Sequence, residues 1–251
     1  MLKKIFVLLI LIISFNLQAA ESNKGPMPKH KWSFNGITGT FDRAALQRGF
    51  KVYREVCAGC HGIRHIAYRD LEDIGFTKDE IKSIASEYEL LDGPNDEGEM
   101  FTRLAKLSDK FVSPYENVNA ARVANNGAYP PDLSLITKAR SGGADYLYSL
   151  LNGYKEYPEN FEASEGMYYN EYYPGNQIAM PAPIEDDIVE YDDGTEASQS
   201  QIARDVTSFL AWTAEPELET RKSLGVKTIF FLILISIMLL GVKRKIWKDL
   251  D

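Results

Sequence analysis

Residues 57–61 read Cys57-Ala58-Gly59-Cys60-His61, and this stretch decides how the rest of the chain is interpreted. Cys-x-x-Cys-His is the attachment motif for c-type haem, in which two thiols add to the porphyrin vinyl groups and the histidine supplies an imidazole to the iron. On a helical turn, both cysteines lie on one side and the histidine follows beneath the ring. The sequence therefore predicts one covalently attached haem c, held by Cys57 and Cys60, with His61 as an iron ligand.

Two other kinds of site share part of this motif. A Cys-x-x-Cys pair also occurs in thioredoxin-like redox sites and in zinc sites. A zinc site needs four ligands, but the chain contains 2 cysteines in all, and no second pair of cysteines or histidines has suitable spacing. A redox pair leaves the adjacent His61 unexplained, so haem attachment is the favoured interpretation.

Composition limits the size and the partners of the protein. The chain has 251 residues, of which 45% are hydrophobic and 25% charged, and this suits one globular domain with attached segments. Its formal net charge of −8 argues against nucleic acid as a partner and is compatible with a basic protein partner. Because haem uses both thiols, no structural disulfide is expected.

The N-terminus has the pattern of a secretory signal. Lys3 and Lys4 precede an apolar run at 5–15, and Ala19-Ala20 supply small residues before a cleavage site. An uncleaved anchor helix is the alternative, but the run is short for a membrane span. A mitochondrial presequence would be rich in Arg and Ser, which this segment is not. We predict a signal peptide at residues 1–20.

A second apolar run, Thr228–Val242, lies near the C-terminus and is extended by residues 224–226. It approaches the roughly 20 residues that cross a bilayer as a helix. Trp247 is placed as an interfacial side chain, and cations follow the run directly: Lys243, Arg244, Lys245 and Lys248. A buried core helix is the alternative, and these cations argue against it.

The positive-inside rule places this cationic end in the cytoplasm. The predicted domains are therefore an extracytoplasmic c-type haem domain at 21–222, a transmembrane helix at 223–245 and a cytoplasmic tail at 246–251. The predicted location is the bacterial inner membrane, crossed once, with the haem domain in the periplasm.

Apolar residues recur at helical spacing between the two apolar runs, so the predicted fold class is mainly α. Asp42 is a suitable N-cap for a helix at 41–60. Thr77 and Glu80 can form a capping box for a helix at 77–90. Further helices are predicted before the Asn125-Asn126-Gly127 turn, after Pro130-Pro131 with Asp132 or Ser134 as cap, at 145–151, at 198–214, and from 217 into the membrane span. Residues 92–98 and 154–183 are predicted as loops.

Met180 is the candidate for the second iron ligand. It lies in Gln177-Ile178-Ala179-Met180-Pro181-Ala182-Pro183, where prolines reduce the freedom of the loop and a rigid loop can hold a thioether. It also lies far enough from His61 in sequence to close the opposite side of the pocket. A buried, gap-filling side chain is the alternative role, and other methionines compete for the ligand position: Met27, Met100 and Met167.

Charged residues suggest two further contacts. Arg122 is a candidate partner for a haem propionate, because a guanidinium matches a planar carboxylate. A solvated surface arginine fits its spacing equally well. Residues 185–196 and 92–99 are rich in acidic side chains, and both read as solvated loops that can also form a docking surface for a basic partner.

Taken in order, these motifs resemble the cytochrome c1 family, the haem subunit of the quinol–cytochrome c oxidoreductase (bc1) complex. The resemblance covers nearly the whole chain after the predicted signal. It runs through Cys57–His61, Ala67-Tyr-Arg69, Asp92-Gly-Pro-Asn95, Gly98-Glu-Met-Phe101, Ala124-Asn-Asn-Gly-Ala128, Pro130-Pro-Asp-Leu-Ser134, Tyr172-Tyr-Pro-Gly175, Ile178-Ala-Met180, Glu190-Tyr-Asp-Asp-Gly-Thr195, Ala214-Glu-Pro-Glu217 and Arg221-Lys222.

The resemblance implies a cytochrome c-type haem domain with long loop insertions and a single C-terminal transmembrane helix. It implies haem attachment at Cys57 and Cys60, His61 as proximal ligand, Met180 as distal ligand and Arg122 as a propionate contact. The implied activity is electron transfer within a quinol–cytochrome c reductase. The electron would come from the Rieske iron–sulfur protein and pass to a soluble basic cytochrome c, with cytochrome b beside the membrane helix.

Two features depart from the family pattern. Gly62 stands where Ser is common, and the extra disulfide of some bacterial members cannot form in this chain. How the long loop before Met180 is stiffened stays open, with its tyrosines and prolines as candidates.

Three other functions use the same haem motif. A free-standing, membrane-tethered cytochrome c would carry electrons to a terminal oxidase. A haem enzyme or gas sensor would keep one iron position open. A structural anchor would use haem only to stabilise the fold.

Overall fold

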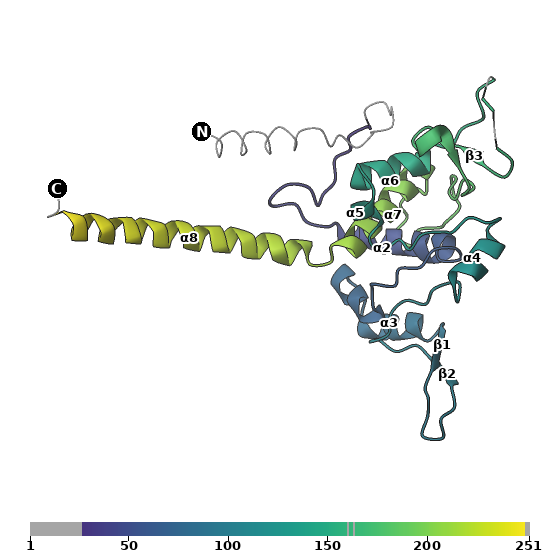
Figure 1. Ribbon diagram of the computed structural model, residues 1–251, viewed down its shortest axis with the longest axis horizontal. Coiled ribbons are helices and arrows are strands. Elements are labelled where there is room, and N and C mark those ends of the chain that lie inside the picture. Colours follow the sequence, from purple (N-terminus) through teal and green to yellow (C-terminus); the bar gives the residue numbers. More distant parts are fainter. Residues whose placement is uncertain (1–26, 160, 163, 249–251) are drawn as a thin grey trace, which may run out of the picture.

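The computed structural model describes residues 27–248, apart from 160 and 163. The predicted signal peptide at 1–20 and the last three residues of the predicted tail lie outside the described residues. In Figure 1, helices gather into a body from which one long helix, α8, projects on its own. The hairpin of β1 and β2 leaves the body on one side, and the loop around β3 leaves it on another.

Helices dominate the fold, as the sequence predicts. They are α2 (Arg43–Val52), α3 (Lys78–Ala85), α4 (Val118–Ala124), α5 (Ile136–Ala139), α6 (Gly143–Asn152), α7 (Gln199–Ala214) and α8 (Leu218–Trp247). Shorter helical turns are η1 (Tyr53–Cys57), η2 (Tyr68–Ile74) and η3 (Pro174–Asn176). The strands are β1 (Glu89–Asp92), β2 (Phe101–Leu104), β3 (Tyr168–Tyr169) and β4 (Gln177–Ile178). β1 pairs with β2 and β3 pairs with β4, both antiparallel.

α2 begins where the sequence predicts, since the Asp42 side chain accepts from the amides of Ala44 and Ala45. The prediction of one helix over 41–60 is confirmed as far as Cys57, but the helix is an α-helix only to Val52. From there the backbone widens into the π-helical turn η1, in which the Ala58 amide donates to the carbonyl oxygen five residues earlier, at 2.8 Å. Such turns are common at functional sites.

The predicted helix at 77–90 is correct at its start and wrong at its end. Thr77 and Glu80 form the expected capping box, and Ile81 and Ile84 are buried. The helix ends at Ala85, because the residues that follow pair with β2 in a hairpin, with Leu91 opposite Thr102. The predicted loop at 92–98 lies at the tip of this hairpin.

α2 crosses α7 at the centre of the core. Gly49 allows the close approach, since a Cβ there would lie 2.1 Å from the Asp205 carbonyl oxygen. Phe50 and Phe209 pack with ring centroids 5.6 Å apart, and the Tyr53 ring lies 5.8 Å from the same Phe209 ring. The crossing therefore holds the residues just before the Cys-x-x-Cys-His motif against the core.

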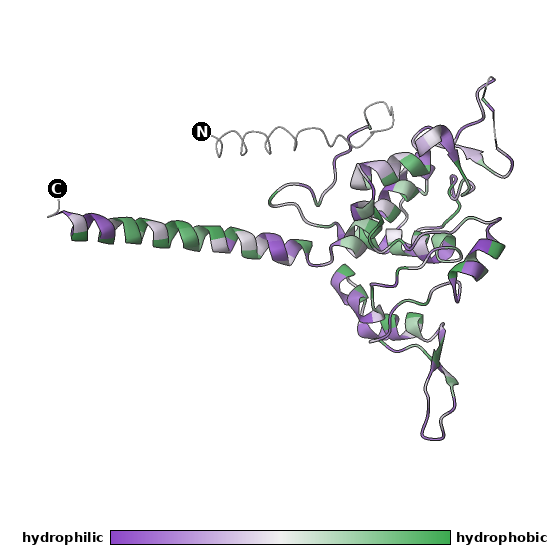
Figure 2. Cartoon of the chain, viewed as in Figure 1, coloured by the Kyte–Doolittle hydropathy of each residue, from purple (hydrophilic) through white to green (hydrophobic). Residues whose placement is uncertain are grey.

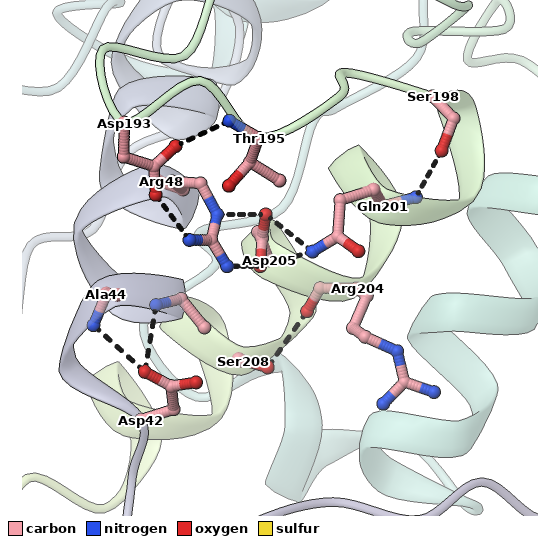
Figure 3. Close-up of polar contacts among 11 residues, drawn as sticks. Asp42, Ala44, Arg48, Asp193, Thr195, Ser198, Gln201, Arg204, Asp205 and Ser208 are labelled. Carbon is pink, nitrogen blue, oxygen red and sulfur yellow. Dashed lines mark hydrogen bonds and ion pairs between the residues drawn. The ribbon is translucent and has the colours of Figure 1, made fainter.

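A buried ion pair ties the same two helices together (Figure 3). Arg48 Nε donates to Asp205 Oδ2 at 2.8 Å, and its Nη1 donates to Asp193 Oδ2 at 2.7 Å. The Asp205 side chain is completely buried, so the arginine offsets the cost of its desolvation. Hydrogen bonds from the Thr195 amide and from Arg48 lower the pKa of Asp193 to about 2. Arg48 thus also fixes the acidic segment around Asp193.

α8 runs for 30 residues from Leu218 to Trp247. Among the described residues it is the one helix long and apolar enough to cross a membrane, with a mean hydropathy of 2.4 in its most apolar stretch. Figure 2 shows this helix hydrophobic along most of its length and unpacked by other elements. It contains the predicted span at 223–245, whose boundaries stay a prediction.

Polar contacts fix the base of α8 to the body. Glu219 accepts from Arg43 Nη2 at 2.8 Å and from the Phe41 amide at 2.7 Å. Lys222 Nζ donates to two backbone carbonyl oxygens of the segment 34–39, at 2.6 and 2.9 Å. The helix therefore continues from the body in a defined direction.

Replacing Arg48 with Met tests the buried ion pair. The change leaves the Asp205 carboxylate buried without its cation, and we expect the free energy of unfolding to fall by about 3–5 kcal/mol. Arg43→Met is the matched control. It removes an exposed pair with Glu219, in which the arginine side chain is 44% exposed, and should cost about 0–1 kcal/mol. Urea unfolding measures both, and equal losses would contradict the role given to Arg48.

Asp193→Asn tests the pH dependence of stability. The folded-state pKa of Asp193, about 2, lies below its ordinary value of 3.8, so the ionised form stabilises the fold. That contribution is fully present above about pH 4 and is lost as the pH falls towards about 2. We expect wild type to lose more stability than Asp193→Asn across this range. If the stability difference between wild type and Asp193→Asn stayed constant over this pH range, the stabilising role of the ionised Asp193 would be contradicted.

Candidate functional site

The Cys-x-x-Cys-His motif follows η1 in a tight turn. The amides of Cys60 and His61 both donate to the Cys57 carbonyl oxygen, at 3.1 and 2.9 Å. Cys57 is half-buried, and burial, followed by the neighbouring Cys60, raises the pKa of its thiol to about 12. Cys60 is exposed. One thiol therefore contacts the core while the other reaches the surface, as expected of residues that attach a ring at the edge of a domain.

The His61 imidazole is oriented by a hydrogen bond. Its Nδ1 lies 2.7 Å from the Pro131 carbonyl oxygen, which can only accept, so Nδ1 carries the proton and the lone pair is on Nε2. Burial lowers the pKa of His61, although this hydrogen bond opposes the shift. A neutral imidazole whose second nitrogen donates to a backbone carbonyl is the form that ligates a metal.

Backbone contacts hold the Pro131 segment beside the motif. The Leu133 amide donates to the Gly62 carbonyl oxygen at 2.8 Å, and Asp132 Oδ2 accepts from the Arg64 amide at 3.0 Å. Gly62 is buried there, and a Cβ on it would lie 3.3 Å from Asp132 Oδ2. The two segments therefore meet closely on both sides of the His61–Pro131 contact.

The predicted capping role of Asp132 or Ser134 is wrong. Ser134 Oγ accepts from the His65 amide at 3.1 Å, so it pairs with the segment after the motif. The next helix, α5, is capped by Leu135 without a side-chain hydrogen bond. Both polar side chains close the loop beside His61 instead.

Met180 packs against the same hydrophobic core as Cys57. It is half-buried, and its backbone carbonyl oxygen accepts a hydrogen bond from the Tyr154 hydroxyl at 3.1 Å. Tyr154 lies two residues after the end of α6, so the loop with Met180 is connected to the body close to that helix. The assignment of Met180 as an iron ligand stays a prediction.

The competing methionines lie in different settings. Met100 and Met167 are 55% and 37% exposed, and Met100 lies in the loop of the β1–β2 hairpin. Met27 packs against the core from the N-terminal segment, which the His30 amide ties to Asp145 of α6. The Met167 carbonyl oxygen also accepts from a tyrosine hydroxyl, that of Tyr157, so Met180 differs from it in packing against the hydrophobic core and in being tied to the residues that follow α6.

Arg122 lies exposed on α4, and its Nη1 donates to the Gly127 carbonyl oxygen at 2.8 Å. The contact closes the turn that the sequence predicts, in which Asn126 and Gly127 have φ of 51° and 86°. The arginine therefore has a local structural role, and its contact with a propionate stays a prediction.

The residues fit a covalently held haem. Two thiols and a neutral imidazole with its lone pair on Nε2 lie within five consecutive residues. Cys57 also packs against the hydrophobic core, so apolar side chains adjoin the motif. The zinc alternative requires a cluster of metal ligands. Across the described part of the chain, no group of three or more His, Cys, Asp or Glu could hold a metal ion.

Comparison with known proteins decides the family. A model described as the Cytochrome C1 family matches residues 32–250. The chain belongs to the cytochrome c1 family. It is similar to "Cytochrome c1 1, heme protein, mitochondrial" of Arabidopsis thaliana, with 49% identity over 242 residues that cover 95% of this chain and 79% of the relative.

Bacterial relatives match equally well. The chain is 47% identical to cytochrome c1 of Rhodospirillum rubrum over 249 residues, which cover 92% of each chain. It is 47% identical to a protein named cytochrome b/c1 from Bradyrhizobium diazoefficiens over 258 residues, which cover 93% of this chain and 38% of that longer protein. Family membership confirms the predicted mainly α haem-domain fold with one candidate C-terminal membrane helix.

Proposed function

We propose that this chain is the electron-transfer subunit of a quinol–cytochrome c reductase of the bc1 type. The Rieske iron–sulfur protein is the proposed donor, a soluble basic cytochrome c is the proposed acceptor, and cytochrome b is the proposed neighbour in the membrane. Membership of the cytochrome c1 family supports this role. The relative named cytochrome b/c1 carries both names on one longer protein, which supports the cytochrome b neighbour.

The proposed cofactor is one haem c, attached through Cys57 and Cys60 and ligated by His61 and Met180. The observation that carries the proposal is the 2.7 Å contact of His61 Nδ1 with the Pro131 carbonyl oxygen, because it leaves the imidazole lone pair on Nε2 beside two thiols. When bound, haem supplies a one-electron iron couple, whose potential a thioether ligand raises relative to a second nitrogen ligand.

The residues of the chain contribute rigidity and shelter from water. The Pro131 carbonyl orients the His61 ring, and the Tyr53 hydroxyl donates to the His61 backbone carbonyl oxygen at 3.0 Å. Cys57 and Met180 pack against the hydrophobic core, which limits the access of water to their sulfur atoms. Arg122 is the proposed partner of a propionate, supported by its exposed guanidinium.

α8 is the proposed single membrane span, with the haem domain at 21–222 in the periplasm of a bacterium and the tail in the cytoplasm. The cations after the apolar run support this orientation. In the proposal, a signal peptide at 1–20 directs export of the chain, which attachment of haem c requires.

The proposed docking surface for a basic cytochrome c lies in the acidic segment after Met180. Asp192 and Asp193 are used internally, because they pair with Lys51 at 3.0 Å and with Arg48 at 2.7 Å. The remaining exposed carboxylates of this part of the segment include Glu185, Asp187 and Glu190. The alternative segment at 92–99 lies at the end of the projecting hairpin (Figure 1), away from the body that carries the motif.

An optical spectrum and a redox titration of the purified membrane protein test the proposal. We expect c-type absorbance that survives acid–acetone extraction, a far-red sulfur-to-iron band, and co-purification with a b-type cytochrome and a Rieske protein. A tethered, free-standing cytochrome would purify alone, and an open-site enzyme would bind carbon monoxide at rest. Loss of all pigment on extraction would overturn the proposal.

Met180→Leu tests the distal ligand, because it keeps the apolar volume and removes the sulfur. We expect haem to stay attached, the far-red band to disappear, and the midpoint potential to fall by on the order of 100 mV, more than a tenfold change for a one-electron couple. Met167→Leu is the control, since that side chain is 37% exposed. The outcome that contradicts the ligation is an unchanged spectrum in Met180→Leu.

Two matched triple variants locate the docking surface. One neutralises Glu185, Asp187 and Glu190 as the amides, and the other neutralises Asp96, Glu97 and Glu99 of the hairpin. Both remove the same charge, so a difference between them reports position. We expect the first to slow reduction of a basic cytochrome c by about tenfold at low salt, with less effect at high salt. A larger effect of the hairpin variant would place the docking surface there.

A further inference from the structure

We infer that Asn170 and Tyr154 are positioning residues for Met180, and that together they stiffen the long loop that carries it. The inference rests on the proposed ligation by Met180. It addresses how this loop is held in a chain whose cysteines both belong to the haem motif.

Asn170 is fully buried, with 0% of its surface exposed, and its side-chain amide bonds in two directions. Its Nδ2 donates to the Leu150 carbonyl oxygen of α6 at 2.8 Å. Its Oδ1 accepts from the amides of Tyr172 and Tyr173, at 3.0 and 3.2 Å. A single buried side chain therefore joins the last turn of α6 to the loop, and each lost bond would leave a buried polar group unsatisfied.

The loop between Asn170 and Met180 is closed by its own hydrogen bonds. The Asn170 amide donates to the Asn176 carbonyl oxygen at 3.0 Å, and Asn176 Nδ2 donates back to the Asn170 carbonyl oxygen at 3.2 Å. β3 and β4 flank this turn, with Tyr168 opposite Ile178. β4 ends two residues before Met180, so little flexible chain separates the closed turn from the sulfur.

Tyr154 holds the far end of the same loop. Its hydroxyl donates to the Met180 carbonyl oxygen at 3.1 Å. The preceding Gly153 allows the loop to lie directly on the helix end. A Cβ there would lie 2.6 Å from Tyr172 Cδ2 and 3.0 Å from Asn170 Oδ1.

Both attachments start from one short stretch, residues 150–154. α6 packs on α7, and α7 crosses α2, which leads into the haem motif. The loop of Met180 and the turn of His61 are therefore both held by the same group of helices. A thioether is a weak ligand on a flexible side chain, so the hold on its backbone decides how often the sulfur leaves the iron.

Exogenous imidazole measures this hold, because it binds ferric haem only when the sulfur leaves. Using the full-length purified protein, we compare wild type with Tyr154→Phe and Asn170→Ala. We expect unchanged haem attachment, a weaker far-red sulfur-to-iron band, and imidazole binding about tenfold tighter in each variant, as the loss of a hydrogen bond predicts. Asn152→Ala is a local control, since it removes a side-chain bond within α6 itself, to Tyr148.

Ile81→Val controls for general loss of stability. Ile81 is fully buried on α3, and α3 lies across the body from β3 in Figure 1. Its imidazole affinity should match wild type despite a loss of about 1 kcal/mol in stability. If Tyr154→Phe and Asn170→Ala bind imidazole no more tightly than Ile81→Val, the inference fails while the proposed function stands.

Two further outcomes are decisive. If Asn170→Ala does not fold, Tyr154→Phe decides alone, because it removes one hydroxyl and keeps the ring. If wild type itself lacks the sulfur-to-iron band, the Met180 ligation of the proposed function fails, and the inference fails with it.

Discussion

The crossing of α2 and α7 at Gly49 is the constraint on which the rest of the structure depends. The helices meet so closely that a side chain at Gly49 would overlap the backbone of α7. Beside this contact, Arg48 and Asp205 form an ion pair whose carboxylate is completely buried. An apolar crossing alone could slide, whereas a buried charge pair has a favourable geometry in one register. α2 continues through η1 into the motif, so this register also sets where its thiols lie.

The contacts that shape the site join segments far apart in sequence. His61 and Pro131 are separated by 70 residues, and Tyr154 and Met180 by 26. In each case a side chain from one segment meets a backbone carbonyl of the other. The position of a carbonyl oxygen depends on the backbone path rather than on a side-chain rotamer. Such contacts therefore fix the two proposed iron ligands relative to the backbone of the body.

What the sequence predicts correctly is local. Asp42, the Thr77–Glu80 capping box and the Asn126-Gly127 turn each depend on a few neighbouring residues, and the structure contains all three. The Cys-x-x-Cys-His motif is likewise specific in five residues, and its order with the other motifs predicts the family. Nothing within a short window reveals that α3 ends in favour of a strand, because the partner of β1 lies beyond the hairpin loop.

The parts of the site that the sequence does not reveal have the same cause. Ser134 is a residue type that often caps helices, but in the folded chain its hydroxyl oxygen accepts a hydrogen bond from the His65 amide instead. Asn170 gives no signal in a loop rich in Tyr and Pro, since its importance comes from burial. The π-helical turn at η1 is equally invisible, because the apolar spacing that predicts helix continues through it.

α2 also connects the motif to the membrane helix. Arg43, the first residue of α2, pairs with Glu219 in the first turn of α8. The 10 residues of α2, which begin with Arg43, are followed by the 5 residues of η1, which end with Cys57. At about 1.5 Å per residue, this stretch spans roughly 20 Å. α2 and η1 therefore form one continuous helical stretch between the base of α8 and the haem motif. Lys222 holds the N-terminal segment to the same base, so a second contact besides the Arg43–Glu219 pair joins α8 to the body.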